Sequence, residues 1–514
     1  MKYPKRYLAI GLSLFFLQMQ CYAGIINVKN FGAKGNGVAD DTKAIQDAIN
    51  AAPVATMSTI YFPAGVYRIA SYTVTRNYLE NYCLLLHANL TVKGDGEKTI
   101  IRLADHIFDK PDTPANAHIF YGLKINNIHF TDLTIDMNGG KNLVPEHYIK
   151  NHTAIFVYLG RNISLNKLTV KNCAGCNMVV IKGNGNLALI EDCKFYNGGN
   201  YVGTDQPNSR QFDFSFVYSE WDSTTIKNNI IEQQNLDIAL SNYTGGIEMH
   251  GSYSHASYNS ITGCYPAFFV SSSWHPMEKT SVENNQIKNC IKGVSFWVIH
   301  PMNNIVIRNN NIQLTYTRLL KPPLLPGIEV PGGNMVNNDD YKPALANAAP
   351  VSNITITGNN ITAVLPDTTK DRTVGLLLHS FQNSVISGNT ITGMNYAGVM
   401  LQGSKWGIND LKINDNSFID FKQNNDAQAI AGYVVITDTY SPKNKNGPGL
   451  KEISFNNNKF IRNQAAAKTF ENKGAPGKFF GAFVALPSSM INEIKFTGNN
   501  FTDPAEKVLS VKTD

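Results

Sequence analysis

A carboxylate and an imidazole stand two residues apart at Glu248 and His250, within an alternating run of polar and apolar residues. Because successive side chains of a β-strand point to opposite faces, Ile247 and Met249 face a core, and Glu248 and His250 project together into solvent. An acid beside an imidazole can orient it and exchange protons near neutral pH. The spacing therefore predicts acid–base catalysis at this pair, although an exposed pair without a function would show the same spacing.

Two of the carboxylates in residues 210–222, a segment whose register the sequence leaves open, are further candidates. Either Asp213 or Glu220 could lie one rung of a sheet from Glu248. One rung is about 4.8 Å, close to the carboxylate separation of a retaining glycosidase, and two rungs approach the inverting range. Glu329 has a similar local sequence, but it lies about three rungs away, roughly 14 Å, which is too far for a catalytic pair.

Groups suited to the other steps of proton abstraction and to sugar binding lie nearby. Tyr218 is an alternative acid, and Arg210 or Lys182 could neutralise the enolate that forms when a proton leaves the carbon beside a carboxylate. Aromatic and polar side chains of the neighbouring strands would hold the apolar faces and the hydroxyls of sugar rings. The candidates for substrate binding are Lys182, Ser271, Trp274, His275, Trp297, His300, His379 and Gln402.

The element that must position these residues is a repeat of short strands. Nine times, an alternating apolar run is followed by an asparagine and, two residues later, by an apolar residue. Most of the successive asparagines stand 25–30 residues apart, a period typical of a solenoid. Stacked coils would place them above one another as an internal ladder of amide hydrogen bonds. These ladder asparagines are Asn229, Asn259, Asn285, Asn310, Asn359, Asn389, Asn416, Asn458 and Asn499.

An N-terminal helix is predicted to cover the first coil. Ile45 and Ile49 recur at helical spacing, and Asp40 and Asp41 are placed to cap the helix N-terminus. Such a helix would protect strand edges that are otherwise unpaired. The predicted organisation is a cap with first coils at 24–103, a β-helix at 104–503 with a proline-rich loop insertion at 313–352, and a C-terminal tail at 504–514.

Residues 26–103 also carry three glycine-containing motifs, which are Phe31-Gly32-Ala33-x-Gly35-x-Gly37-x-x-Asp40-Asp41-Thr42, Phe62-Pro63-x-Gly65-x-Tyr67 and Val92-x-Gly94-x-Gly96. With them the segment resembles the N-terminal part of the pectate-lyase-like superfamily of rhamnogalacturonase-like, epimerase-like and tailspike-like proteins. The resemblance implies an all-β fold, a single-stranded right-handed parallel β-helix with an N-terminal capping α-helix. The Glu248–His250 pair is similar to the acid-x-His element of the alginate-epimerase branch, where the acid is Asp.

Residues 1–23 are predicted to be a secretory signal peptide, because basic residues precede an apolar run too short to span a bilayer. The protein is therefore expected to be secreted or periplasmic. Removal of Lys2, Lys5 and Arg6 lowers the formal net charge from +6 to +3, and no stripe of Lys and Arg indicates nucleic-acid binding. The predicted partner is a polysaccharide, without membrane contact after cleavage, for a monomer or a homotrimer.

Six cysteines remain after cleavage. Cys264 and Cys290 each follow a ladder asparagine by five residues, so they should stack within reach of a disulfide, and both buried thiols and a disulfide stay open. Cys173-x-x-Cys176 lacks a second pair at zinc-finger spacing. Since no clustered carboxylates indicate calcium either, neither a metal nor a cofactor is predicted.

These observations favour a carbohydrate-active enzyme that cleaves or epimerises a uronate-containing polysaccharide by proton abstraction, in a groove along the outer face of the β-helix. Two alternatives stay open. The first is a glycoside hydrolase that uses Glu248 with Asp213 or Glu220. The second is a non-catalytic glycan-binding rod.

Overall fold

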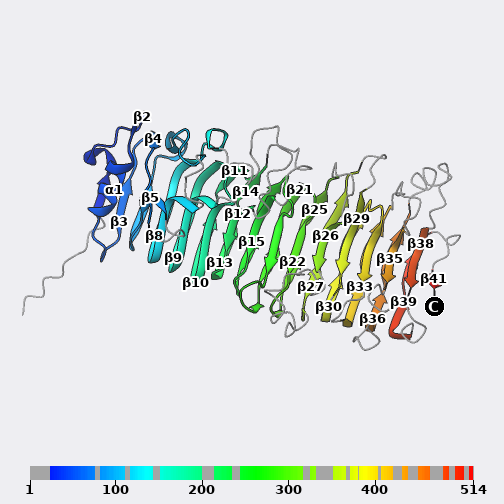
Figure 1. The fold of residues 1–514 in the computed structure, drawn as a ribbon. Coiled ribbons are helices and arrows are strands. Elements are labelled where there is room, and N and C mark those ends of the chain that lie inside the picture. Colours follow the sequence, from blue (N-terminus) through cyan, green and yellow to red (C-terminus); the bar gives the residue numbers. More distant parts are fainter. Residues whose placement is uncertain are drawn as a thin grey trace, which may run out of the picture.

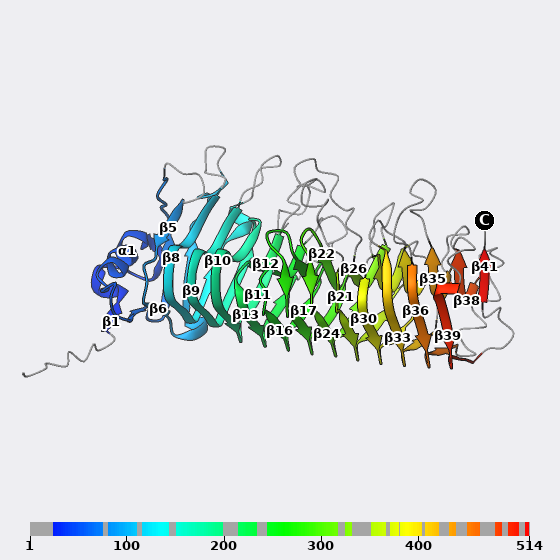
Figure 2. The same ribbon diagram turned by 90° about the horizontal axis from the view of Figure 1, so that it is seen from below.

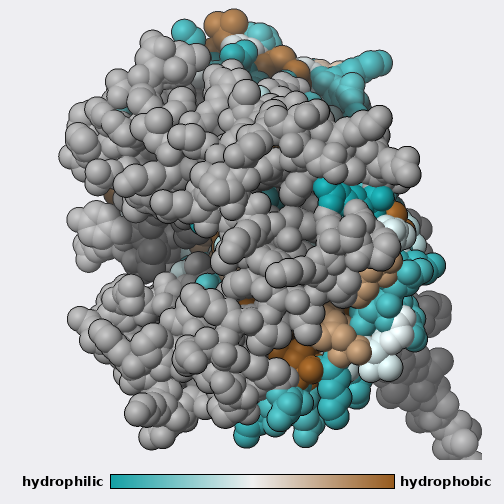
Figure 3. All heavy atoms as spheres, turned by 90° about the vertical axis from the view of Figure 1, so that its right-hand side faces the viewer, coloured by the Kyte–Doolittle hydropathy of each residue, from teal (hydrophilic) through white to brown (hydrophobic). Residues whose placement is uncertain are grey.

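The computed structural model describes residues 24–75, 81–109, 116–142, 151–198, 214–233, 244–316, 324–330, 351–365, 371–379, 381–402, 407–420, 431–437, 450–462, 479–485, 492–502 and 509–512. Within these ranges the chain winds into a rod, with α1 at one end and β41 near the other (Figures 1 and 2). The rod is a single-stranded right-handed parallel β-helix, as predicted. Seen from the C-terminal end, hydrophilic side chains alternate with hydrophobic ones along the described flank (Figure 3).

Each coil contributes strands to three parallel faces. The front face, which contains Glu248, comprises β5 (Tyr82–Leu85), β12 (Phe214–Ser219), β15 (Thr244–Met249), β18 (Phe268–Ser271), β22 (Val294–Trp297), β26 (Leu324–Val330), β29 (Arg372–Leu378), β32 (Ala397–Gln402), β35 (Ala431–Thr437), β38 (Phe479–Ala485) and β41 (Leu509–Lys512). Three long strands join it to the other faces: β8 (Asn116–Asp136), β9 (Asn151–Cys173) and β10 (Asn177–Glu191).

The next face along each coil is the side face. It comprises β1 (Gly24–Asn27), β3 (Ser58–Tyr61), β6 (Leu90–Lys93), β13 (Asp222–Lys227), β16 (His255–Ser257), β20 (Ser281–Glu283), β24 (Val306–Arg308), β27 (Thr355–Thr357), β30 (Phe381–Ser387), β33 (Ile408–Asn414), β36 (Leu450–Asn456) and β39 (Ile494–Thr497).

The ladder face follows the ladder asparagines. It comprises β2 (Asn36–Asp40), β4 (Gly65–Ile69), β7 (Thr99–Leu103), β11 (Lys194–Gly198), β14 (Ile230–Glu232), β17 (Ser260–Thr262), β21 (Gln286–Cys290), β25 (Asn311–Leu314), β28 (Asn360–Ala363), β31 (Thr390–Thr392), β34 (Ser417–Ile419), β37 (Lys459–Ile461) and β40 (Asn500–Phe501). A separate pair, β19 (Met277–Glu278) and β23 (Met302–Asn303), lies between the front and side strands of its coils.

The predicted asparagine ladder is confirmed. The Nδ2 atom of each ladder asparagine donates to Oδ1 of the next at 2.9–3.0 Å, from Asn229 through to Asn499. The backbone N–H of each donates to the same Oδ1 at 2.9–3.1 Å. Each Nδ2 also donates to a strand carbonyl of the preceding coil, as Asn259 does to Ile226. The buried amides are therefore satisfied within the rod.

A residue in the left-handed conformation precedes each ladder asparagine and turns the chain from the side face to the ladder face. The φ angles at these nine positions lie between 55° and 65°. Asn, Asp and Gly tolerate such angles, and they occupy eight of the positions, with the exposed Tyr258 at the ninth. A Cβ on Gly358 would lie 2.4 Å from Oδ1 of Asn309. The Asn-Asn and Gly-Asn pairs of the sequence therefore mark this corner.

The helix α1 (Thr42–Asn50) packs against β5 at the N-terminal end of the rod (Figure 1). The carboxylate of Asp40 accepts the first N–H group of the helix at 3.0 Å. The carboxylate of Asp41 instead accepts the N–H groups of Lys34 and Gly35, at 2.6 and 3.1 Å. The prediction that both aspartates cap the helix is thus right for Asp40 and wrong for Asp41. The carboxylate of Asp41 instead stabilises the turn at Lys34 and Gly35.

Two of the predicted segment boundaries require correction. The range 313–352 is not a single loop, because β26 (Leu324–Val330) within it is a regular rung that pairs with β22 and β29. The predicted tail 504–514 contains β41, which pairs with β38. Prolines in the first segment and the absence of a ladder asparagine in the second concealed these rungs. The predicted signal peptide 1–23 lies outside the described residues, and among those described no helix is long and apolar enough to cross a membrane.

The six cysteines of the described chain are buried, and none of them is in a disulfide. Cys264 and Cys290 do stack on adjacent coils, with the Cys264 N–H donating to Sγ of Cys290 at 3.3 Å, but as thiols rather than as a disulfide. Cys173 and Cys176 likewise carry no disulfide. Burial raises the pKa of the Cys173 thiol and of the Cys193 thiol to about 12, because a thiolate is poorly solvated in the core.

The folded protein is therefore expected to resist thiol reagents. At pH 8 an aromatic disulfide reagent should react with the native chain about a thousandfold more slowly than with free cysteine, since the thiolate fraction is small and the sulfurs are buried. In denaturant without reductant, all six cysteines of the chain lacking residues 1–23 should react, and the reagent should release six equivalents of its aromatic thiol per chain. Four equivalents would instead indicate a disulfide and contradict the structure.

Candidate active site

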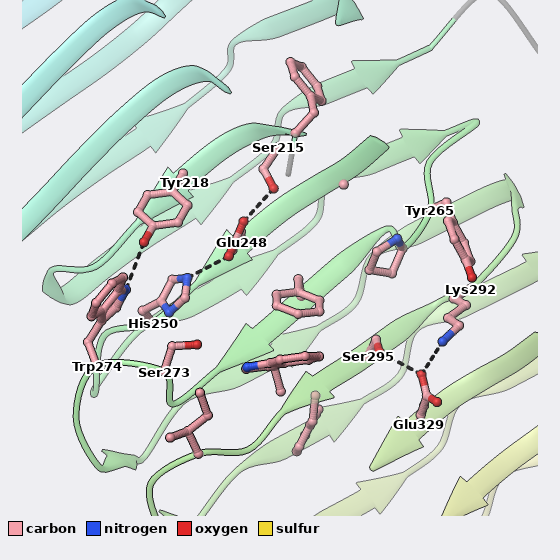
Figure 4. A pocket seen from close by; sticks show the side chains of 17 residues that line it. Ser215, Tyr218, Glu248, His250, Tyr265, Ser273, Trp274, Lys292, Ser295 and Glu329 are labelled. Atoms are coloured by element: carbon pink, nitrogen blue, oxygen red, sulfur yellow. Dashed lines mark hydrogen bonds and ion pairs between the residues drawn. The ribbon is translucent and has the colours of Figure 1, made fainter. Parts of the chain in front are cut away.

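A cavity of about 470 Å³ opens on the front face over β12, β15, β18, β22 and β26. Its volume lies in the range usual for sites that bind small molecules. Aromatic rings are combined there with a few acidic, basic and hydroxyl groups, an arrangement suited to sugars (Figure 4). The lining residues are Phe214, Ser215, Tyr218, Gly245, Glu248, His250, Tyr265, Pro266, Phe269, Ser273, Trp274, Lys292, Ser295, Phe296, Trp297, Ile299 and Glu329.

The outward column of side chains on the front face changes character at this cavity. Parallel register stacks Tyr218, Glu248, Phe269, Ser295 and Glu329 on successive coils. Before and after the cavity the same column consists of buried apolar or aromatic side chains, namely Tyr121, Phe156 and Val180 on one side and Leu377, Met400 and Val435 on the other. Because buried carboxylates cost free energy, their confinement to the cavity marks it as the functional region.

Glu248 and His250 form a hydrogen-bonded dyad, with 2.8 Å between Oε1 and Nε2 (Figure 4). The hydroxyl of Ser215 donates to Oε2 of the same carboxylate at 2.8 Å. An ionised carboxylate can only accept, so Nε2 carries a proton, and in the neutral imidazole Nδ1 then keeps a lone pair. Nδ1 is buried and has no hydrogen-bond partner among the described residues. Such a nitrogen costs stability, and in the neutral imidazole it is the ring atom that can still accept a proton.

The dyad is covered more deeply than the sequence predicts. Alternation placed Glu248 and His250 on the outward side correctly, but they expose only 6% and 3% of their surface, so the prediction of a solvated pair is wrong. The ring of Tyr218, on the preceding coil, lies against the imidazole with ring centroids 4.8 Å apart. Strand alternation determines the face of a side chain, whereas its depth depends on neighbouring coils.

Tyr218 is fixed at the N-terminal end of the cavity through its hydroxyl. The hydroxyl donates to Oε1 of Glu220 at 2.5 Å and accepts from Nε1 of Trp274 at 3.0 Å. Nζ of Lys182 lies 3.6 Å from the same Oε1 atom. Burial, followed by the negative charges of Glu220 and Glu248, raises the pKa of Tyr218 far above its ordinary value. Tyr218 therefore stays protonated, and it can transfer its proton only to a strongly basic atom, such as a carbanion or an alkoxide.

A second polar cluster lies at the C-terminal end of the cavity. Nζ of Lys292 is 2.6 Å from Oε2 of Glu329, and the hydroxyl of Ser295 donates to the same oxygen at 2.8 Å (Figure 4). The Lys292 ammonium also lies 5.7 Å from the ring centroid of Tyr265. His379, on the following coil, has its pKa lowered by burial, and the nearby Glu329 opposes that shift. The cavity thus holds two carboxylate centres, one at each end.

Comparison with known proteins places the chain in a family. A family model described as rhamnogalacturonase A/epimerase, pectate lyase-like, matches residues 25–295, more than half of the 514 residues. The chain belongs to this rhamnogalacturonase A/epimerase family. The matched segment includes the dyad and Tyr218, and it ends before Glu329.

Partial relatives of this family member include enzymes that act on uronate polysaccharides. Mannuronan C5-epimerase AlgE5 of Azotobacter vinelandii is 41% identical over 113 residues, which are 22% of this chain and 11% of the relative. Alginate lyase 7 of the same organism is 38% identical over 113 residues, which are 22% of this chain and 12% of the relative. The aligned part therefore spans only about a tenth of the length of either relative.

A solved structure shares the fold over nearly the whole family member. The tailspike protein of E. coli bacteriophage HK620, in complex with a pentasaccharide, covers 95% of this chain and 80% of that chain. The TM-score is 0.60 at 14% identity, so the likeness concerns the fold alone.

The structure brings several of the predicted catalytic residues of this family member together. Glu248, His250 and Tyr218 line the cavity, and Glu220 lies directly behind Tyr218. The register of 210–222, which the sequence left open, is given by the pairing of Tyr218 with Glu248. Glu220 therefore occupies the position on its coil that matches His250 on the next coil. Two further candidates, Arg210 and Asp213, lie outside the described residues.

The predicted substrate-binding residues divide into two groups. Trp274 and Trp297 line the cavity, and Lys182 lies 5.2 Å from the ring centroid of Trp274. Neither Lys182 nor the remaining candidates line it; the latter are Ser271, His275, His300, His379 and Gln402. Ser271 and Trp297 pair on the adjacent strands β18 and β22. Ser271 is buried, however, with its hydroxyl bonded to that of Ser273.

Tyr265 and Lys292 were not predicted from the sequence. Both stand just before a front strand, at a corner where the alternation that places strand residues no longer applies. The bond of Ser215 to Glu248 depends on the register of β12, which the sequence left open. No signal in the sequence indicates the Lys292–Glu329 contact, because 37 residues separate the two.

A metal site is not apparent in the described part of the chain. There, no group of three or more His, Cys, Asp or Glu side chains is placed to hold an ion.

Proposed function

We propose that this family member is a uronate-polysaccharide lyase or epimerase that removes the C5 proton of a uronate residue bound in the cavity. The observation that carries this proposal is the buried Glu248–His250 dyad beneath Tyr218. The partial relatives, mannuronan C5-epimerases and an alginate lyase, support chemistry of the same class.

His250 is assigned as the proton acceptor. Its Nε2–H is engaged by Glu248, which leaves Nδ1 as the ring nitrogen without a hydrogen-bond partner among the described residues. When the imidazole accepts the proton, the bond to Glu248 becomes charge-assisted and stabilises the cation. Ser215 holds the carboxylate in the orientation this requires.

The electron pair left at C5 moves onto the uronate carboxyl group, and a nearby cation must balance that charge. Lys182 is assigned this role, since its Nζ lies 5.8 Å from the Tyr218 ring centroid. Tyr218 then donates its proton. Donation to C5 from the opposite face gives the epimer. Donation to the departing O4 completes cleavage of the C4–O4 bond and leaves a C4–C5 double bond.

The geometry gives less support to a glycoside hydrolase. Both oxygens of Glu220 already accept, Oε1 from Tyr218 and Oε2 from the Gly183 N–H at 2.6 Å, and Glu220 does not line the cavity. Glu329 lines it but stands three rungs from Glu248, about 14 Å, beyond the separation of either glycosidase class.

A panel of uronans tests the proposal. Purified protein is incubated with polymannuronate, polyguluronate and polygalacturonate in D2O. A lyase gives the ultraviolet absorbance of the unsaturated product, and an epimerase gives changed sugar resonances with deuterium at C5. New reducing ends without unsaturation would select the hydrolase, and binding without any reaction would select the glycan-binding rod.

Tyr218→Phe separates proton abstraction from proton return. We expect product formation to fall at least about a hundredfold, because a general acid is lost, whereas exchange of the C5 proton with D2O continues. Tyr258→Phe, at an exposed tyrosine of a corner, is the control and should match the wild type. If exchange and product formation fall equally, Tyr218 is not the proton donor.

Export, which residues 1–23 predict, and assembly as a monomer or a homotrimer are further proposals. Neither affects the assignment of the site.

A further inference from the structure

The mechanism leaves the cluster at the C-terminal end of the cavity unused. Glu329 and Ser295 each expose only 6% of their surface, and the Lys292 side chain exposes 13%. These side chains come from two adjacent coils, so parallel register rather than local sequence assembles the cluster. A buried ion pair adds little net stability, and stability alone therefore gives no reason for placing one in a cavity wall.

The cluster retains hydrogen-bonding capacity directed at the cavity. Lys292 and Ser295 both donate to Oε2 of Glu329, and within the described part of the chain Oε1 accepts no hydrogen bond. An ammonium has three donors, and one of those of Lys292 is used by Glu329. A donor with positive charge beside a free carboxylate oxygen matches a sugar that carries both a carboxylate and hydroxyl groups.

The spacing between the two ends of the cavity matches a linear polysaccharide. Glu329 lies three rungs from Glu248 along one column. A rung of about 4.8 Å is close to the length of one sugar residue in an extended chain. Between the ends lie Phe269 and Trp297, with ring centroids 6.1 Å apart, which offer apolar surfaces to the intervening sugar rings.

We propose that Lys292, Ser295 and Glu329 form a second uronate subsite, which receives a residue of the same polysaccharide chain about three sugars from the residue at the Glu248–His250 dyad. Lys292 binds its carboxylate, and Oε1 of Glu329 accepts one of its hydroxyl groups. The inference rests on the proposed function. It adds a recognised substrate length, because a chain must reach both ends of the cavity.

Oligouronides of increasing length test this subsite. For the wild type, kcat/KM is expected to rise about tenfold when the chain becomes long enough to reach Lys292, the gain expected from one charge-assisted contact. Lys292→Gln should lose this rise. Lys288→Gln, at an exposed lysine of the ladder face on the same coil, should keep it. A full rise with Lys292→Gln would overturn the proposal.

A second variant covers the case in which Lys292→Gln folds poorly because Glu329 is left unpaired. Lys292→Gln combined with Glu329→Gln removes both charges, so no buried carboxylate lacks a partner, and it should also lose the rise. If the wild type converts no uronan, the proposed function fails. The subsite is then judged by equilibrium binding of a long oligouronide, where equal affinity of the wild type and Lys292→Gln would reject it.

Discussion

Glu248→Gln is expected to lower kcat on the accepted uronan by about 10²–10⁴-fold, the usual contribution of a group that supports proton transfer. The amide preserves the size of the side chain and can still contact Ser215 and His250. It cannot stabilise the imidazolium that forms when His250 takes the C5 proton, because the negative charge is gone. The loss should therefore appear in turnover more than in substrate affinity.

Initial rates of unsaturated product or of C5 deuterium exchange measure this effect, alongside the thermal unfolding midpoint. Glu232→Gln, on β14 of the ladder face, makes the same chemical change away from the cavity and should keep wild-type turnover. Undiminished turnover by Glu248→Gln would remove the dyad from the mechanism. If both variants and the wild type bind uronan without turnover, the protein is a glycan-binding rod.

Asn359→Ala is expected to lower the free energy of unfolding by about 3–5 kcal/mol, since each buried polar group left without a partner costs about 1–3 kcal/mol. Oδ1 of Asn359 accepts both the N–H and the Nδ2 of Asn310, and its Nδ2 serves the Ile307 carbonyl and Asn389. Alanine removes these four bonds, and a fifth from Nδ2 to the Thr357 carbonyl, at a buried position. Chemical denaturation monitored by circular dichroism measures the change.

The adjacent residue supplies the control. Asn360 is exposed, and its amide makes one surface bond to Asn311, so Asn360→Ala should change stability by less than about 0.5 kcal/mol. Asn499→Ala, at the less buried end of the ladder, should fall between the two. Equal effects at 359 and 360 would show that the ladder contributes nothing specific, and a graded series would show that it stabilises coil stacking.

The ladder made much of the fold predictable. Its period places like residues on one face, and the pairing of Ser271 with Trp297 agrees with the alignment drawn from the sequence. The spacing to the ladder asparagines also agrees with the observed register of β12. Tyr218 stands 11 residues before Asn229, as Glu248 does before Asn259. In the next coil the interval lengthens to 16 residues, between Phe269 and Asn285. Corner lengths therefore vary, and one match could not establish the register.

The parts of the site that the sequence did not predict depend on packing between coils. The burial of His250 follows from the Tyr218 ring of the preceding coil, and the Lys292–Glu329 contact joins residues of different turns. Neither relation is visible in a local pattern, because alternation describes one strand at a time. The segment 313–352 was misread for a similar reason: its prolines suggest a loop, yet Pro326 lies within β26, paired with β29.

The ladder amides all point the same way, and this gives the rod a chemical direction. From Asn229 to Asn458, the N–H and the Nδ2 of each ladder asparagine donate to Oδ1 of the asparagine in the following coil, and the Cys193 N–H begins the series by donating to Oδ1 of Asn229. A rod that ends at any intermediate coil therefore presents unsatisfied donors at its C-terminal edge, and the next coil brings the acceptor. Each boundary between coils is therefore polar, with donors on its N-terminal side and acceptors on its C-terminal side.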